Sequence, residues 1–162
     1  MRHSELLLVA LLAISGSNSA YAQLELNGHI YAEPGSSVAT YVDRLKNGTT
    51  EWQRYNAACA LGELGDKSAI PALIDALDSP SNSVRECAVS SLGDLGAVAA
   101  VPRITKLLRD SSPDARANAA YSLAELGAVK SIPDIKNMFT DSSPHVQASA
   151  REAVQYLEAH KK

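Results

Sequence analysis

Apolar residues recur along this chain in blocks that repeat every 31 residues. Each block contains a segment of about 14 residues with apolar side chains at helical spacing, as in Ala88, Leu92 and Leu95. A shorter apolar segment follows it, as in Val101, Ile104 and Leu108. The pattern predicts two helices per unit, a longer helix A and a shorter helix B, and the fixed period predicts an array of stacked units.

The polar and special residues between these segments keep the same period. The residues expected to cap helix A are Thr50, Ser81, Ser112 and Ser143. Thr50 with Gln53 matches a capping box. The glycines expected to end helix A in the left-handed conformation are Gly65, Gly96 and Gly127. The prolines expected in the first turn of helix B are Pro71, Pro102 and Pro133.

The fold class predicted is all-α, a right-handed α-solenoid of antiparallel helix pairs of the armadillo or HEAT type. Its repeat domain covers residues 37–162. It contains a half-repeat at 37–47, full repeats at 50–80, 81–111 and 112–142, and a half-repeat at 143–160. Neither helix of a unit can bury its apolar face alone, so stacking supplies the common core.

The first 22 residues follow a different plan, that of a secretory signal peptide. Arg2 precedes an apolar run that is too short to cross a bilayer, and an Ala-x-Ala site ends at Ala22. We therefore predict an exported protein, periplasmic or secreted, with a membrane anchor as the alternative. Residues 23–36 show no periodicity and are expected to form a flexible leader.

Composition narrows the function classes further. The chain is 46% hydrophobic with a net charge of -3, and its acids and bases are interspersed. No basic stripe is present for nucleic acid, so we expect neither nucleic-acid binding nor membrane insertion, and we expect a monomer. After a shift of one period, Cys59 and Cys87 point about 60° apart in similar directions. We expect them to remain unbridged, with a disulfide as the open alternative.

One repeat reads Val84-Arg85-x-x-Ala88-x-x-x-Leu92-Gly93-x-Leu95-Gly96, followed by Val101-Pro102. This pattern resembles the HEAT-like repeat of the bilin-lyase type. The resemblance implies two possible chemistries, that of deoxyhypusine hydroxylase, with irons held by His-Glu pairs, and that of the lyases which handle bilin chromophores. None of the four histidines precedes a glutamate, and only generic repeat residues are present, so we predict no enzyme activity and neither metal nor cofactor.

The periodic charged rows have a structural interpretation. The arginine row is expected to pair with turn acids or to cap a neighbouring turn, and it contains Arg54, Arg85 and Arg116. The acidic row is expected to be solvated or paired between repeats, and it contains Glu63, Asp94 and Glu125.

By analogy with HEAT solenoids, we expect helix B to line the concave side and to bind a protein or peptide. The outward residues of this predicted strip are Ala72, Asp75, Arg103, Lys106, Asp134 and Asn137. Trp52 and Tyr55, near the start of the first helix A, form a second candidate patch. The function predicted is a non-catalytic protein-interaction scaffold or adaptor of the cell envelope. The alternative is an accessory or lyase-like factor of a tetrapyrrole or other cofactor enzyme system.

Overall fold

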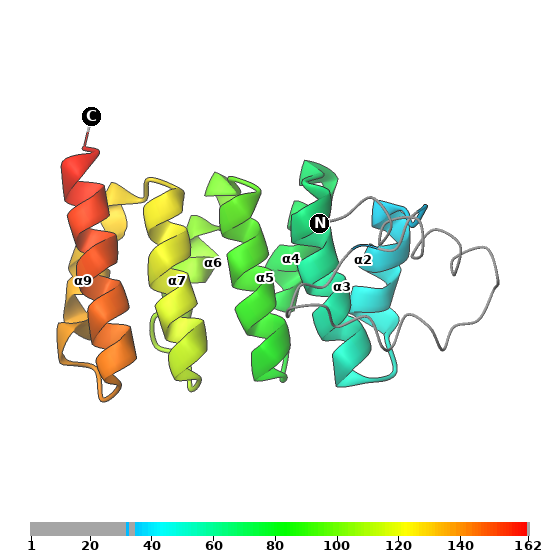
Figure 1. Cartoon of the computed structure of the whole chain (residues 1–162), viewed down its shortest axis with the longest axis horizontal. Helices are drawn as coiled ribbons and strands as arrows, with labels where there is room; N and C mark the ends of the chain where they lie inside the picture. Colours follow the sequence, from blue (N-terminus) through cyan, green and yellow to red (C-terminus); the bar gives the residue numbers. More distant parts are fainter. Residues whose placement is uncertain (1–31, 33–34, 162) are drawn as a thin grey trace, which may run out of the picture.

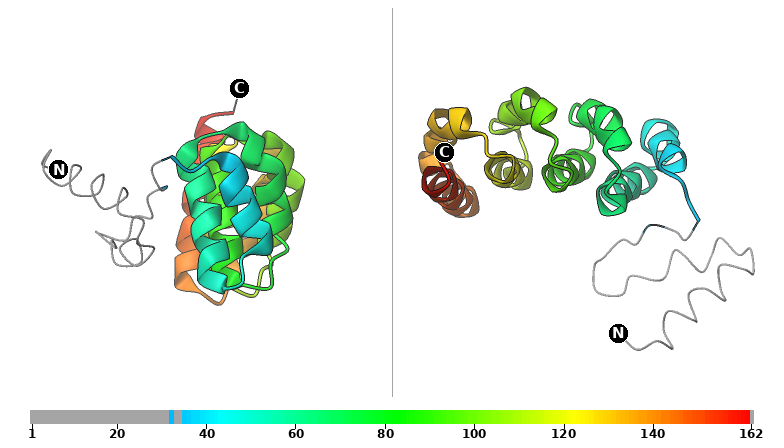
Figure 2. Two further views of the ribbon diagram at one scale, coloured as in Figure 1. Left: turned by 90° about the vertical axis from the view of Figure 1, so that its right-hand side faces the viewer. Right: turned by 90° about the horizontal axis from the view of Figure 1, so that it is seen from above.

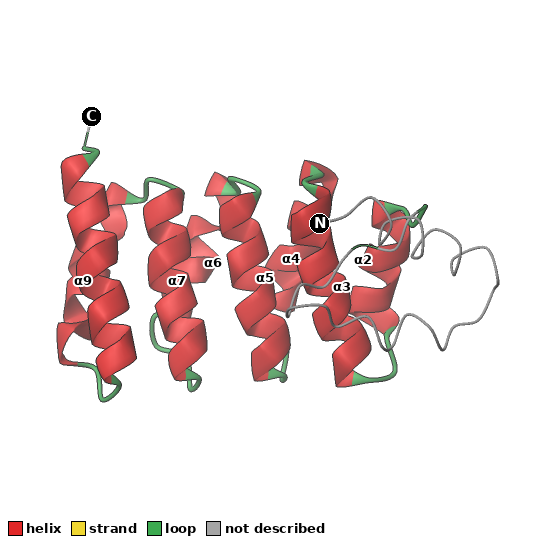
Figure 3. Ribbon diagram, in the orientation of Figure 1, coloured by secondary structure: helices red, strands yellow, loops and turns green. Residues whose placement is uncertain are grey.

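The computed structural model describes residue 32 and residues 35–161. The described residues form eight α-helices and no strand (Figure 3). The helices are α2 (Val38–Asn47), α3 (Glu51–Leu64), α4 (Ile70–Ala76), α5 (Asn82–Asp94), α6 (Val101–Leu107), α7 (Pro113–Glu125), α8 (Ile132–Lys136) and α9 (Pro144–Ala159). The predicted alternation of a long and a short helix is confirmed.

The helices are arranged in two parallel rows (Figure 1). Helix A of successive units corresponds to α3, α5, α7 and α9, and helix B corresponds to α2, α4, α6 and α8. Between the rows lies one continuous apolar core, whose fully buried members include Leu61, Leu73, Leu92, Ile104, Leu123 and Ile135. The fold is therefore an α-solenoid, as the sequence predicts.

The row of helices A lies on the inner side of a shallow arc when the stack is seen from above (Figure 2). Neighbouring helices A pack directly on one another, whereas successive helices B are joined to the stack mainly through the adjacent helices A. Because the more closely packed row has the shorter path, the stack bends toward helix A. The prediction that helix B lines the concave side is wrong, and its exposed residues lie on the outer side.

Small residues bring the helices A together. A Cβ built on Gly62 would lie 2.4 Å from Ser91 Oγ of the next helix. The same hydroxyl donates a hydrogen bond to the Ala58 carbonyl at 3.0 Å. One unit later, the Ser122 hydroxyl donates to the Val89 carbonyl at 2.9 Å. The first glycine of each Leu-Gly-x-Leu-Gly pair thus permits close helix packing, a role that the sequence analysis missed.

The predicted helix ends are largely confirmed. Thr50 accepts a hydrogen bond from the Gln53 amide, and the Gln53 side chain completes the capping box. Ser81 and Ser112 cap α5 and α7 in the same way, whereas the Ser143 side chain makes no capping bond. The three glycines predicted to be left-handed have φ values of 69°, 64° and 64°, at Gly65, Gly96 and Gly127.

A short 3₁₀ turn precedes three of the helices B. The turns are η2 (Lys67–Ala69), η3 (Val98–Ala100) and η4 (Val129–Ser131). The predicted proline then occupies the first turn of each of these helices. After α8 the chain continues as η5 (Asn137–Thr140) before the turn into α9.

The predicted signal peptide and most of the predicted leader lie outside the described residues. Within the described part of the chain, none of the helices combines the length and apolar character needed to span a bilayer.

Candidate functional site

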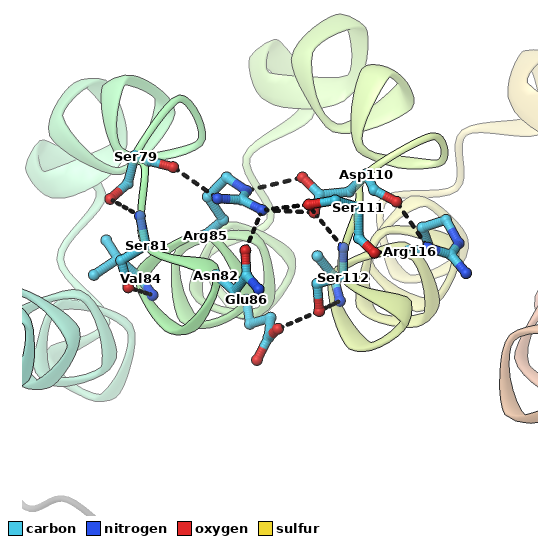
Figure 4. Close-up of polar contacts among 11 residues, drawn as sticks. Ser79, Ser81, Asn82, Val84, Arg85, Glu86, Asp110, Ser111, Ser112 and Arg116 are labelled. Atoms are coloured by element: carbon cyan, nitrogen blue, oxygen red, sulfur yellow. Dashed lines mark hydrogen bonds and ion pairs between the residues drawn. The ribbon is translucent and has the colours of Figure 1, made fainter. Parts of the chain in front are cut away.

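The periodic arginines are engaged in the turns between units (Figure 4). Arg85 donates to both carboxylate oxygens of Asp110, at 2.8 Å from Nε and 2.7 Å from Nη2. Its Nη1 also donates to the Ser79 carbonyl at 2.8 Å. Arg85 and Asp110 side chains are each only 11% exposed. The bidentate pair joins α5 to the turn after α6, and the bond to Ser79 joins it to the turn after α4.

Equivalent contacts occur in the other units, but the first and last units of the stack form them differently. Arg116 pairs with Asp141 and donates to the Asp110 carbonyl at 2.7 Å. Among the described residues, Arg54 keeps only the carbonyl contact, to Gly48, and Gln147 occupies the equivalent position in α9, where it donates to the Asp141 carbonyl. The predicted structural role of the arginine row is confirmed, and Arg85 and Arg116 are fully engaged in the turns.

The pKa of Asp110 reflects two opposing causes. Burial on its own would raise this pKa, but hydrogen bonds from Arg85 and the Ser112 amide, with the Arg85 charge, outweigh burial and lower it. For Asp141 the hydrogen bonds from Arg116 are the main cause, and they also lower the pKa. Both carboxylates are therefore held ionised as parts of the scaffold.

Cys59 of α3 and Cys87 of α5 form a disulfide, with their Cα atoms 5.4 Å apart. The expectation that they remain unbridged is wrong. A rotation of about 60° about the helix axis places one thiol on the flank facing the next helix and the other on the flank facing the preceding helix. Since the two helices are in close contact, these flanks oppose each other.

The outward residues predicted on helix B are not all equivalent. Arg103 on α6 forms an ion pair with Asp78, which lies just beyond α4. Asp75 is exposed, and Ala72 is buried, so the prediction that Ala72 points outward is wrong. The predicted strip is therefore interrupted in its first unit.

Three of the predicted residues do come together. Lys106, Asp134 and Asn137 line an open groove of about 510 Å³. Arg109 and Asp141 complete its charged lining, although Asp141 is already bound by Arg116. The groove lies on the outer side of the stack, between α6 and the segment from α8 to the turn before α9, and it carries charges of both signs.

The opposite surface is formed by the sides of the helices A that are turned away from helix B. We call it the inner face and define it by the residues at i, i+4, i+7 and i+11 of each helix A. Its members are Trp52, Asn56, Cys59 and Glu63; Ser83, Cys87, Ser90 and Asp94; Asp114, Asn118, Tyr121 and Glu125; His145, Ser149, Glu152 and Tyr156, of which Ser149 is fully buried. The inner face includes the predicted acidic residues Glu63, Asp94 and Glu125. It also includes Tyr121 and Tyr156, which were not predicted from the sequence.

Three large aromatic side chains are exposed on the inner face. Trp52 is 53% exposed, Tyr156 is 49% exposed and Tyr121 is 38% exposed. Tyr121 donates a hydrogen bond to Glu152 at 2.7 Å, across the contact between α7 and α9. Tyr55, the other residue of the predicted aromatic patch, is half-buried against the core. Only the Trp52 part of that patch is thus well exposed.

The carboxylate of Glu125 lies over the backbone of the preceding helix A. A Cβ built on Gly93 would lie 2.4 Å from Glu125 Oε2. Burial, and secondly the charge of Asp94, raises the pKa of Glu125. The predicted acidic row therefore contains two carboxylates that repel each other rather than pairing between repeats.

No group of three or more metal-binding side chains occurs in the described part of the chain. The charged residues that come together there do so as ion pairs at turns, as a mixed groove, or as the acidic inner face.

The two-row stack places the chain in the class of helical-repeat scaffolds. The sequence profile of HEAT repeats matches residues 38–110 and 91–155. The chain belongs to the HEAT-repeat family. A search of curated proteins finds no match.

Solved structures with the same fold include two from enzyme systems. The complex of CpcE and CpcF of phycocyanin lyase from Nostoc is 30% identical, with a TM-score of 0.67 over 75% of this chain and 53% of that chain. Human deoxyhypusine hydroxylase is 24% identical, with a TM-score of 0.64 over 75% of this chain and 43% of that chain. An engineered protein is 22% identical, with a TM-score of 0.60 over 75% of this chain and 62% of that chain. This chain thus spans about half the length of the lyase chain.

Proposed function

We propose that this protein is a non-catalytic protein-interaction scaffold of the cell envelope. The observation that carries the proposal is the exposure of Trp52, Tyr121 and Tyr156 on one face of a HEAT-repeat stack. Exposed aromatic side chains on a preformed surface are typical of protein-binding hot spots. Stacked repeats present such residues on an extended surface, which suits a protein or peptide partner.

The use of the polar residues supports a non-catalytic role. Arg85, Arg116, Asp110 and Asp141 hold the turns together, so they are committed to the architecture. The matched lyase structure is itself a complex of two proteins, CpcE and CpcF, which favours a protein as the partner here.

Two features support an exported location. The N-terminal sequence has the plan of a signal peptide with a cleavage site after Ala22. The Cys59–Cys87 disulfide suits an oxidising compartment, where such bonds persist.

A second candidate function is that of an accessory factor for a tetrapyrrole-handling enzyme. The outer groove of about 510 Å³ favours it, because ligand pockets have this size. Its open shape and mixed charges favour the scaffold instead. Titration of the mature protein with a linear tetrapyrrole, followed by visible absorption, distinguishes the two, since a scaffold leaves the chromophore spectrum unchanged.

The scaffold proposal is tested by affinity capture from envelope extracts, with captured proteins identified by mass spectrometry. We expect one protein to be captured by the wild type and by R103E/K106E, which alters only the outer side. W52A/Y156A, which truncates two exposed aromatics, should lose that protein while keeping its helical circular dichroism. If the wild type captures no protein beyond those bound by a heat-denatured sample, the proposal is wrong.

A further inference from the structure

The inner face has a one-sided charge distribution. Its sixteen positions include five carboxylates and neither lysine nor arginine, and the carboxylates belong to Glu63, Asp94, Asp114, Glu125 and Glu152. The arginines of the helices A are directed elsewhere. Arg85 and Arg116 pair with acids of the turns, and the other two donate to backbone carbonyls, Arg54 to that of Gly48 and Arg151 to that of Phe139. The solvent-facing side of the inner row is therefore acidic along α5, α7 and α9.

Several of these carboxylates lack a counter-charge. None of the hydrogen bonds or ion pairs among the described residues involves Asp94, Asp114 or Glu125. Glu125 is also packed over Gly93 and repelled by Asp94, which raises its pKa. Carboxylates that lie close together without a cation repel each other in the free protein. A bound cationic group would relieve this repulsion.

The exposed tyrosine rings occupy helix A positions next to the acids or equivalent to them in another repeat. Tyr121 lies four residues before Glu125 on α7, one helical turn away. Tyr156 occupies on α9 the position that Glu125 occupies on α7. A guanidinium or ammonium group can bind a carboxylate while it stacks on a neighbouring ring, so the two features favour the same kind of ligand.

The spacing along the stack suits an extended chain. Packed helices are roughly 8–10 Å apart, and a peptide in the extended polyproline II conformation advances about 3.1 Å per residue with three residues per turn. Equivalent carboxylates on neighbouring helices A, such as Asp94 and Glu125, are thus about three peptide residues apart, and every third side chain of such a peptide points to the same side. A segment with a cation at about every third residue would place successive cations on successive helices.

We propose that the inner face binds an extended segment of the protein partner that is rich in lysine or arginine. This inference rests on the scaffold function proposed above and adds the chemistry and the conformation of the bound segment. Charge complementarity selects this occupant over an apolar helix or an acidic segment.

The test uses the mature full-length protein and a fluorescent peptide of about twelve residues, with arginine at every third position and alanine and serine between. Binding is measured by fluorescence anisotropy at low and at moderate salt. We expect saturable binding that weakens with salt. The control peptide, with glutamine in place of arginine, should not bind.

A matched pair of variants locates the site. D94N/E125Q removes two charges from the inner face, and D75N/D134N removes the same number from helix B. We expect D94N/E125Q to weaken peptide binding about tenfold, with D75N/D134N within about twofold of the wild type. Absence of peptide binding to the wild type, equal binding of the glutamine peptide, or equal loss in both variants would each overturn the inference.

The same variants in the envelope capture separate this inference from the scaffold proposal. A partner captured by the wild type and lost from D94N/E125Q supports both. A partner that D94N/E125Q retains at full yield refutes the cationic-segment inference and leaves the scaffold proposal standing.

Discussion

Arg116 binds Asp141 through two parallel hydrogen bonds, each 2.8 Å long, and so joins α7 to the turn that precedes α9. The third guanidinium nitrogen donates to the Asp110 carbonyl at the end of the preceding helix B. One side chain thus fixes the position of three segments. Since Arg85 repeats the arrangement one unit earlier, register between units depends on these turns as well as on the apolar core.

Replacing Asp141 with asparagine should destabilise the fold by about 1–3 kcal/mol at neutral pH, because Arg116 loses a charged partner. The pKa of Asp141 is lowered by Arg116, so the stabilisation is fully present above its ordinary value of 3.8. It is lost as the pH falls through the lowered pKa of the folded state. Urea unfolding from neutral to acidic pH should show the wild type and D141N converging in acid. D75N, at an exposed site on α4, is the control, and an equal effect of both variants would contradict the prediction.

Removing the disulfide should lower stability without changing the fold. Cys59 and Cys87 are separated by 28 residues. Loop-closure entropy for that length gives a loss of about 3–4 kcal/mol on reduction or in C59S/C87S. Thermal unfolding with and without dithiothreitol measures the loss, and C59S/C87S should show no further response to the reductant. If an alkylating reagent modifies both cysteines of the wild-type protein without prior reduction, the bond is absent.

The sequence predicted the local structure better than the relations between helices. Thr50, Gly96 and Pro102 act within their own helix ends, so their roles can be recognised from neighbouring residues. The Cys59–Cys87 bond, the burial of Ala72 and the direction of curvature depend on how closely one helix A approaches the next. That distance is set by contacts such as Gly62 with Ser91, which are 29 positions apart in sequence and carry no separate signal.

In the candidate sites too, local patterns could be predicted from the sequence, whereas features that depend on how the helices stack could not. The acidic row at Glu63, Asp94 and Glu125 was recognised from its period, but its position on the inner side required the curvature of the stack. Tyr121 and Tyr156 break the repeat, with no aromatic at the equivalent positions of the second unit, Ser90 and Asp94. A pattern built on recurrence passes over residues of that kind.

Replacing Gly62 with alanine should destabilise the protein, although alanine normally favours a helix by about 1 kcal/mol. The new methyl group would lie 2.4 Å from Ser91 Oγ and 3.1 Å from Ser91 Cα. Overpacking of this kind costs about 1–3 kcal/mol, and backbone has to move to relieve it. Denaturant unfolding should place G62A below the wild type. A124G, which makes the opposite exchange at the equivalent site of α7, is the companion variant and should cost about 1 kcal/mol through helix propensity. A stabilised G62A would contradict the close packing.

A substitution at Gly96 tests the left-handed end of α5, whereas G62A tests the packing of α3 against α5. Its φ of 64° disfavours a β-branched side chain, while a Cβ added to this glycine would meet no atom within 4 Å. Valine at this position should therefore lower the melting temperature through backbone strain alone. Calorimetry measures the shift, with G96N as the control, since asparagine tolerates the left-handed region and should lose less. Equal melting temperatures for G96V and the wild type would contradict the left-handed cap.

Neutralising Glu125 should stabilise the free protein and so reveal the charge conflict on the inner face. Its pKa is raised above the ordinary value of 4.5 by burial and by Asp94. A raised carboxyl pKa favours the folded state below 4.5, and this advantage is lost as the pH rises through the raised pKa. E125Q should therefore melt about 2 °C above the wild type at neutral pH, and the gap should close in acid. The control is D114N, which removes a charge from the first turn of α7, where the helix dipole favours an acid, so it should melt at or slightly below the wild type. An E125Q variant that is less stable than the wild type at neutral pH would show that the carboxylate is held by a favourable partner, and the case for an unsatisfied acidic face would lose its main support.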